Sequence, residues 1–170
     1  MSKLVSPHGG GELKSLLVAE VERAAELERA RGLKQVPMTS KETSDVLMFA
    51  MAAYTPLDGF MDEADWKGVC ADMKMADGLF WPIPITLSAA QGLADSIGIG
   101  EEVALIDGES GDIMAVMQVS EKYAIDKEFE CQHVYTTTDT AHPGVAKVME
   151  QEAVNLGGSV RVLNEGEYKE

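Results

Sequence analysis

The chain has 170 residues, 45% of them hydrophobic, and its 14 Lys and Arg against 29 Asp and Glu give a formal net charge of −15. This composition predicts one domain of ordinary size with a true hydrophobic core and argues against intrinsic disorder. Because an acidic chain repels phosphate backbones and anionic headgroups, we expect neither nucleic acid nor a membrane as a partner.

Two helices are predicted before the first turn-rich stretch. Apolar residues at helical spacing favour the first over residues 12–31, and Gly32 is a natural stop after it. Thr39 and Glu42 have the spacing of a capping box, so a second helix begins there and should end near Tyr54. The predicted buried stripes are Leu13, Leu16, Leu17, Val21, Ala24 and Leu27 in the first helix, and Val46, Leu47, Ala50 and Met51 in the second.

A third helix follows a turn at residues 55–59. Asp62 is suited to cap it, and the segment from Lys74 to Gly78 should close it. Its predicted buried side chains, spaced as on one helix face, are Trp66, Val69, Cys70 and Met73.

The stretch DGLFWPIPITL, Asp77 to Leu87, combines apolar residues with prolines at alternate positions. Proline has no backbone N–H, so Pro82 and Pro84 remove two donors from the same side of a strand. We therefore predict an edge strand, or one at the opening of a barrel, in which the prolines prevent unwanted pairing.

A β-hairpin is the clearest prediction of the second half. Residues 103–106 and 113–119 are apolar on both faces and flank the turn-rich sequence DGESGD, which suggests central strands covered on two sides. A short helix over Ser88 to Ser96 and a turn at GIGEE, Gly98 to Glu102, should precede it.

Two helices and a strand are expected after the hairpin. The first helix is predicted from Lys127 to Tyr135, and Pro143 suits the first turn of the second, which should end at Gly157. A final strand is predicted from Ser159 to Leu163. The apolar face of the second helix would consist of Val145, Val148, Met149, Ala153 and Leu156.

No residue pattern points to catalysis or to a bound cofactor. The sequence lacks a GxxxxGK[ST] phosphate loop, and HGGG, His8 to Gly11, resembles an oxyanion-hole segment without the G-x-S-x-G nucleophile that accompanies one. We interpret these glycines as letting the N-terminal segment bend. We therefore assign no catalytic, cofactor-binding or metal-binding residue and expect no cofactor in this chain.

The histidines and cysteines favour structural roles. His8, His133 and His142 are not at metal-ligand spacing, and His142 can cap a helix or place its ring where an anion would bind, the cap being favoured. Cys70 and Cys131 are too few and too far apart for a disulfide scaffold, so both are expected as reduced thiols in the core. With no signal-peptide or membrane-span pattern, we expect a soluble cytoplasmic protein.

Five segments, in order along the chain from Lys3 to Leu163, carry a resemblance to a known family. They are KLVSPHGGGEL, TSKETSDVLMFAMAAYTPLDGFM, DGLFWPIPITL, DKEFECQHVYTTTDTAHPGV and VMEQEAVNLGGSVRVL, of which TPLDGFM, WPIPITL and TDTAHPGV are the most specific. Together they resemble the N-terminal region of ATP sulfurylase, sulfate adenylyltransferase.

This resemblance implies an α+β fold, a PUA-like small β-barrel with surrounding helices over residues 1–163. Residues 164–170 would then be a polar tail or the start of a linker. The family makes adenosine 5′-phosphosulfate and pyrophosphate from ATP and sulfate, and a following α/β domain carries that reaction. The signatures of that domain, QxRNPxH and a GRDHAG-like segment, do not occur here, so the chain alone should be inactive.

The implied partners are the catalytic domain of the same enzyme and, as a further possibility, copies of itself in a homo-oligomer. A stand-alone PUA-like protein that binds a partner or regulates sulfur metabolism is the alternative. RNA binding, which the PUA-like fold would also allow, conflicts with the net charge of −15.

Two positions depart from the pattern of the family. Thr136 stands where the family commonly has a glycine after the Val-Tyr pair, and Ala52-Ala53-Tyr54 replaces a Gly-Gly-Phe-like or Gly-Ala-Phe-like approach to the PLDGFM turn. These differences put the local turn geometry in question.

Overall fold

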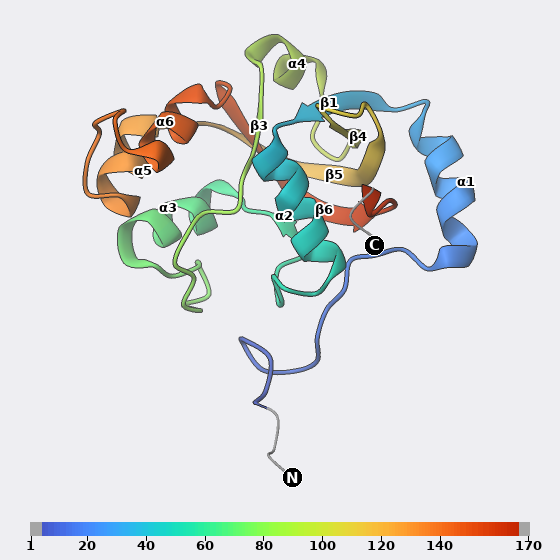
Figure 1. The fold of residues 1–170 in the computed structure, drawn as a ribbon, viewed down its shortest axis with the longest axis horizontal. Coiled ribbons are helices and arrows are strands. Elements are labelled where there is room, and N and C mark those ends of the chain that lie inside the picture. Colours follow the sequence, from blue (N-terminus) through green and yellow to red (C-terminus); the bar gives the residue numbers. More distant parts are fainter. Residues whose placement is uncertain (1–4, 167–170) are drawn as a thin grey trace. The chain divides into compact units, whose positions relative to one another are not determined.

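The computed structural model describes residues 5–166. Helices and strands alternate from α1 to β4, after which β5 follows β4 and α6 follows α5 (Figure 1). Their bounds are α1 Glu20–Ala30, β1 Lys34–Met38, α2 Ser40–Ala50, β2 Gly59–Phe60, α3 Glu63–Asp72, β3 Leu87–Ala89, α4 Gln91–Ser96, β4 Glu102–Asp107, β5 Ile113–Ala124, α5 Lys127–Val134, α6 Pro143–Glu150 and β6 Val154–Val162.

The described residues divide into two compact units. Unit 1 consists of residues 5–59, 102–118 and 159–166, and unit 2 of residues 60–101 and 119–158. The chain passes between the units within β2, directly before β4, within β5 and within β6.

The predicted α+β class is confirmed, but the predicted closure into a barrel is wrong. The six strands form an open sheet in the order β1-β4-β5-β6-β2, with β3 paired to β6 off this path. A barrel needs a continuous ladder between its first and last strands. At one end of the path, β2 is only two residues long, too short for such a ladder.

The hairpin of β4 and β5 is confirmed, with an antiparallel register that pairs Val103 with Met117 and Ala104 with Val116. Strand β1, which pairs with β4 in parallel, was not predicted. Its sequence KQVPM is short, does not alternate cleanly and contains Pro37, and each of these features argues against a strand.

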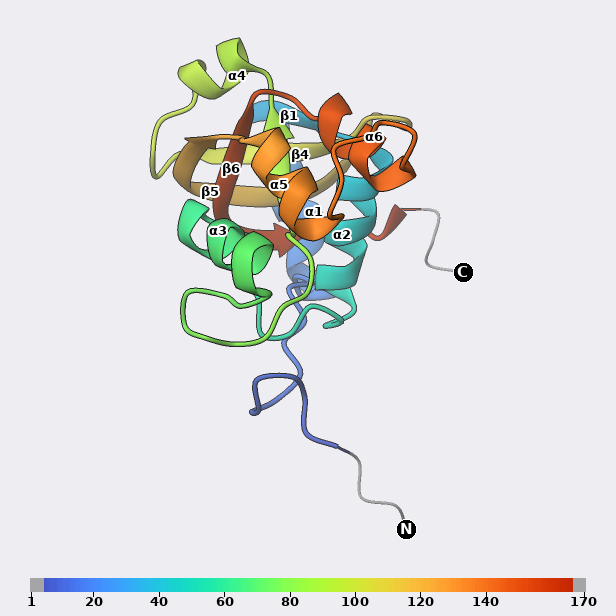
Figure 2. The same ribbon diagram turned by 90° about the vertical axis from the view of Figure 1, so that its left-hand side faces the viewer.

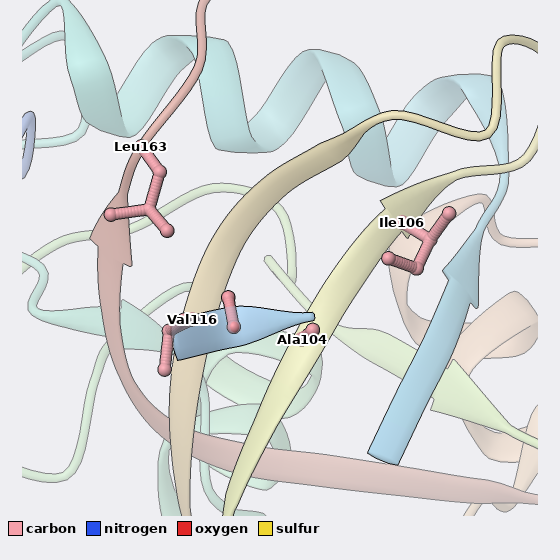
Figure 3. Packing of buried hydrophobic residues seen from close by; sticks show 5 residues of the cluster. Ala104, Ile106, Val116 and Leu163 are labelled. Carbon is pink, nitrogen blue, oxygen red and sulfur yellow. The ribbon is translucent and has the colours of Figure 1, made fainter. Parts of the chain in front are cut away.

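A hydrophobic cluster fills the core of unit 1. Figure 3 shows Ala104 and Ile106 on β4, Val116 on β5 and Leu163 directly after β6. Ala30, at the end of α1, completes the cluster, so the helix is fixed by its last turn. Partly buried side chains around the cluster are Val18, Leu27, Leu33 and Ile113.

The first predicted helix is too long at its N-terminal end, since α1 begins only at Glu20. The residues before it are extended and use their backbone groups in long-range pairing. Val18 N–H donates to Val162 O at 2.9 Å, and Val162 N–H donates to Leu16 O at 2.8 Å. Leu13 and Val21, predicted as buried, are 71% and 91% exposed. Tertiary pairing thus overrides the helical spacing of the leucines.

Helix α2 has the predicted capping box, in which the Thr39 side chain accepts from Glu42 N–H and the Glu42 carboxylate accepts from Thr39 N–H. It ends at Ala50, before the predicted end at Tyr54. Ala52 has a φ of 61°, which a right-handed helix cannot accommodate. Met51 is consequently 62% exposed, against the prediction.

Helices α3, α5 and α6 belong to unit 2, and Figure 2 shows them next to one another. Asp62 caps α3 as predicted, its carboxylate accepting from Asp65 N–H at 2.8 Å. Met73 is 53% exposed instead of buried, because it forms the left-handed C-cap of α3. The helices are held together by Trp66, Cys70, Tyr123, Phe129 and Val134 and by Cys131, Tyr135, Val145, Val148 and Met149.

The proline-bearing stretch is not an edge strand. Strand β3 begins only at Leu87, and Pro82 and Pro84 lie in the loop before it. β3 pairs antiparallel with β6, so the helix predicted from Ser88 begins at Gln91 as α4.

The last predicted helix ends earlier than expected. Helix α6 stops at Glu150, and β6 begins at Val154 instead of Ser159. Leu156 and Gly157 therefore belong to a strand. A Cβ on Gly157 would lie 3.0 Å from Met61 O, so glycine permits a close backbone approach here and does not end a helix.

The beginning of the predicted polar tail is held in unit 1. Asn164 N–H donates to Met114 O at 3.1 Å, and Glu165 forms an ion pair with Arg23 at 3.2 Å. Residues 167–170 of the tail lie outside the described residues, and the domain boundary stays a prediction.

Two helical glycines should respond oppositely to alanine. A Cβ on Gly68 in α3 would lie 2.4 Å from the backbone oxygen of Lys74, whereas a Cβ on Gly92 in α4 meets nothing within 4 Å. We expect Gly68→Ala to lower the free energy of unfolding by about 1–3 kcal/mol through overpacking. Gly92→Ala should raise it by up to about 1 kcal/mol through helix propensity. Urea unfolding checks both, and equal effects at the two positions would contradict the packing described for α3.

Candidate functional site

The loop between α5 and α6, residues 135–142, carries the most distinctive sequence motif of unit 2. His142 N–H donates to Asp139 O at 3.0 Å, and the Asp139 carboxylate accepts from Ala141 N–H at 2.9 Å. His142 caps α6 as predicted, because its Nδ1 accepts from Gly144 N–H at 3.1 Å. The exposed loop is therefore fixed by its own backbone and side chains.

Tyr135 is the aromatic anchor of this loop. Its ring centroid lies 5.0 Å from that of His142. A Cβ on Gly144 would lie 2.5 Å from Cε1 of Tyr135, so the missing side chain of Gly144 makes room for the ring. Burial, followed by the nearby Glu130, raises the pKa of Tyr135 above its ordinary value, and the phenol stays protonated at neutral pH.

The two departures from the family pattern both fall on left-handed backbone. Thr136 has a φ of 59° and Ala52 a φ of 61°. A residue with a Cβ pays about 1–2 kcal/mol in this region, whereas glycine adopts it freely. The turns thus keep a conformation that suits glycine although the sequence supplies Thr and Ala.

The three histidines lie in different segments and make separate local contacts. Nδ1 of His133 lies 2.8 Å from Phe129 O, one turn earlier in α5, and its ring packs 4.2 Å from that of Phe129. His8 is exposed in the segment where Gly9 to Gly11 all have positive φ, which agrees with the predicted bend. Within residues 5–166, no group of three or more His, Cys, Asp and Glu side chains could hold a metal ion.

Both cysteines are buried free thiols, as predicted. Burial is the main cause that raises the pKa of Cys70 and of Cys131 above the ordinary value, and the negative charge of Glu130 adds to it. Glu130 itself is 4% exposed and accepts a hydrogen bond from Trp66 Nε1 at 2.8 Å. Since the thiolate is the reactive form, these thiols act as packing groups.

The arrangement combines hydrogen-bonded surface loops with a buried hydrophobic core. In the part of the chain that the structure describes, no helix is long and apolar enough to cross a membrane. Sequence reasoning identified the His142 cap from the order His-Pro. It did not predict that the Tyr135 ring packs against Gly144, because this close approach depends on tertiary packing.

The fold and these motifs define the class of protein. Residues 5–165 match the family model of the PUA-like domain, and the chain belongs to that family.

Curated relatives of this chain confirm the predicted resemblance to sulfate adenylyltransferase. The chain is 60% identical to a sulfate adenylyltransferase of Syntrophobacter fumaroxidans, covering 99% of the chain and 42% of that protein. It is 55% identical to the one of Thiobacillus denitrificans (100% and 42%) and 54% identical to the one of Chlorobaculum tepidum (97% and 41%). The chain thus spans about two fifths of the length of these relatives.

A solved structure has a similar fold. It is described as a hexameric APS kinase from Thiobacillus denitrificans and superposes with a TM-score of 0.72 at 26% identity. The match covers 98% of this chain and 28% of that one. In both comparisons, nearly the whole chain corresponds to a minor part of a larger protein.

Thr136 provides a test of the strained turn. Thr136→Gly should raise the free energy of unfolding by about 1 kcal/mol, because it removes the left-handed strain of a β-branched residue. The neighbouring Thr138 has no positive φ, so Thr138→Gly should cost up to about 1 kcal/mol through added flexibility of the unfolded chain. Thermal and urea unfolding of both variants measure this, and a loss of stability in Thr136→Gly would contradict the strained turn.

Proposed function

We propose that the chain is the N-terminal, non-catalytic scaffold domain of a sulfate adenylyltransferase. The complete enzyme would make adenosine 5′-phosphosulfate and pyrophosphate from ATP and sulfate in the cytoplasm. The observation that carries the proposal is the asymmetry of coverage, since 97–100% of this chain corresponds to 41–42% of each relative.

Physical chemistry supports a scaffold role over a catalytic one. Adenylyl transfer to sulfate needs cations or hydrogen-bond donors for the charge that develops on the phosphates. This chain has a net charge of −15, and its buried thiols have raised pKa values. The residues that bind ATP and sulfate would then belong to the rest of the enzyme.

The partners follow from the same comparison. The first is the catalytic part of the same polypeptide, and the second is further copies of the enzyme in a homo-oligomer. The description of the structural neighbour as hexameric supports assembly. A stand-alone PUA-like regulator is less favoured, because the relatives that match almost the whole chain are longer proteins. The net charge of −15 disfavours nucleic acid and anionic membranes as partners.

A chimeric enzyme tests the proposal. In the Syntrophobacter fumaroxidans enzyme, the segment that matches residues 5–165 is replaced by this chain, and ATP formation from adenosine 5′-phosphosulfate and pyrophosphate is assayed. We expect kcat/KM within about tenfold of the parent, a change of about 1.4 kcal/mol at most, because the exchanged part does not touch reacting atoms.

The parent enzyme with that segment deleted is the control and should be inactive or aggregate, since the remaining part would lose the scaffold against which it packs under the proposal. A chimera that folds and assembles like the parent but has lost activity by several orders of magnitude would contradict the proposal. It would show that residues of this segment take part in the chemistry.

A further inference from the structure

Residues 73–84 (the α3–β3 loop), which form most of the connection between α3 and β3, contain no helix but are held in place by hydrogen bonds within the loop. Trp81 N–H donates to Met73 O, and Met75 N–H donates to Leu79 O, each at 2.8 Å. The Asp77 carboxylate accepts from Leu79 N–H at 2.8 Å, which closes a tight turn around Gly78, whose φ is 88°. Pro82 and Pro84 further restrict the backbone that follows.

The α3–β3 loop exposes large apolar side chains. Met73, Phe80 and Ile83 are 53%, 52% and 40% exposed. Trp81, between them, is 7% exposed and anchors the loop to unit 2. In Figure 2 the loop is the green segment below α3. The turn and the prolines thus fix in advance the shape in which apolar side chains meet solvent, which lowers the entropy cost of docking a partner.

The size of the patch argues for a partner in the same polypeptide. Three half-exposed side chains offer on the order of 300 Å² of apolar surface. A stable interface between separate proteins buries about 800 Å² on each partner, so this patch alone cannot hold a second, freely diffusing copy. A tethered partner needs far less, because a short linker gives it an effective concentration in the millimolar range.

Such a tethered partner is available in the relatives. They match this chain over 41–42% of their length, so most of each relative lies outside the matched part. We infer that the α3–β3 loop is a docking surface for the remaining, catalytic part of the enzyme, with Phe80 and Met73 as the apolar contacts. This inference rests on the proposed function and adds to it the surface through which the scaffold acts.

Thiol labelling at Phe80 tests the inference. The native Cys70 and Cys131 are buried and should react slowly with an aromatic disulfide reagent in the folded protein. Phe80→Cys introduces an exposed thiol, and its labelling rate is measured in the isolated chain and in the chimeric enzyme. We expect labelling to be at least tenfold slower in the chimera. Ile99, which is 63% exposed in the same unit, supplies the control variant Ile99→Cys, whose rate should be the same in both proteins.

A second variant keeps the test independent of cysteine chemistry. Phe80→Ser should lower the unfolding midpoint of the isolated chain only to the extent that its half-buried side chain contributes to folding. In the chimera the midpoint should fall by a larger amount, because the docked contact is lost as well. Equal labelling rates at Phe80→Cys in chain and chimera would overturn the inference, and so would equal slowing at Ile99→Cys.

The outcome for the proposed function is separate. A chimera that is active while Phe80→Cys stays fully reactive refutes the docking surface and leaves the scaffold role standing. An inactive but folded chimera refutes the scaffold role itself. If labelling of Phe80→Cys in the isolated chain becomes slower as the protein concentration rises, the surface binds a second copy of the chain, and the inference is overturned.

Discussion

The hairpin of β4 and β5 is the constraint on which unit 1 depends. Val103, Ala104 and Leu105 are completely buried on successive, opposite faces of β4, so both faces of the strand must be covered. A shift of register by one residue would exchange the two faces and break every pair along the ladder. The hairpin is covered by three other segments. Strand β1 pairs with β4, and the last turn of α1 and the segment after β6 pack against the buried side chains of the hairpin.

Unit 2 depends on a different kind of constraint. Helices α3, α5 and α6 of this unit are short, between 8 and 10 residues, and helices of this length are not stable alone. They are held by aromatic packing around Trp66, whose ring centroid lies 5.8 Å from Tyr123 and 5.5 Å from Phe129. The Tyr123 hydroxyl in turn donates to Met61 O at 3.0 Å. Caps at Asp62, Asp126 and His142 then define where each helix begins.

Local signals made the sequence predictive where they were strong. The Thr39 capping box, the Asp62 cap and the DGESGD hairpin depend on neighbouring residues, and all appear where predicted. Long-range backbone pairing cannot be read from neighbouring residues. For this reason the helix predicted over Leu16 and Leu17 was wrong, β1 was not predicted, and the start of β6 was placed too late. The edge strand predicted around the prolines at 82 and 84 is wrong, because these residues lie in the loop before β3.

In the candidate site too, local features could be predicted from the sequence, whereas features that depend on tertiary packing could not. His142 could be assigned as a cap from sequence, whereas the close approach of Gly144 to Tyr135 could not. Thr136 and Ala52 drew attention only as departures from a family pattern, and their left-handed φ values explain why glycine suits those positions. Together these features describe a domain that presents hydrogen-bonded loops on a buried hydrophobic core. Under the proposed function, the chemistry belongs to the part of the relatives that this chain does not match.

The central claim, that this chain contributes structure and no chemistry, is tested most directly by an assay of the isolated chain. ATP formation from adenosine 5′-phosphosulfate and pyrophosphate should not exceed the blank without protein, even at high protein concentration. A rate that exceeds the blank, rises in proportion to the chain and disappears on its denaturation would contradict the claim.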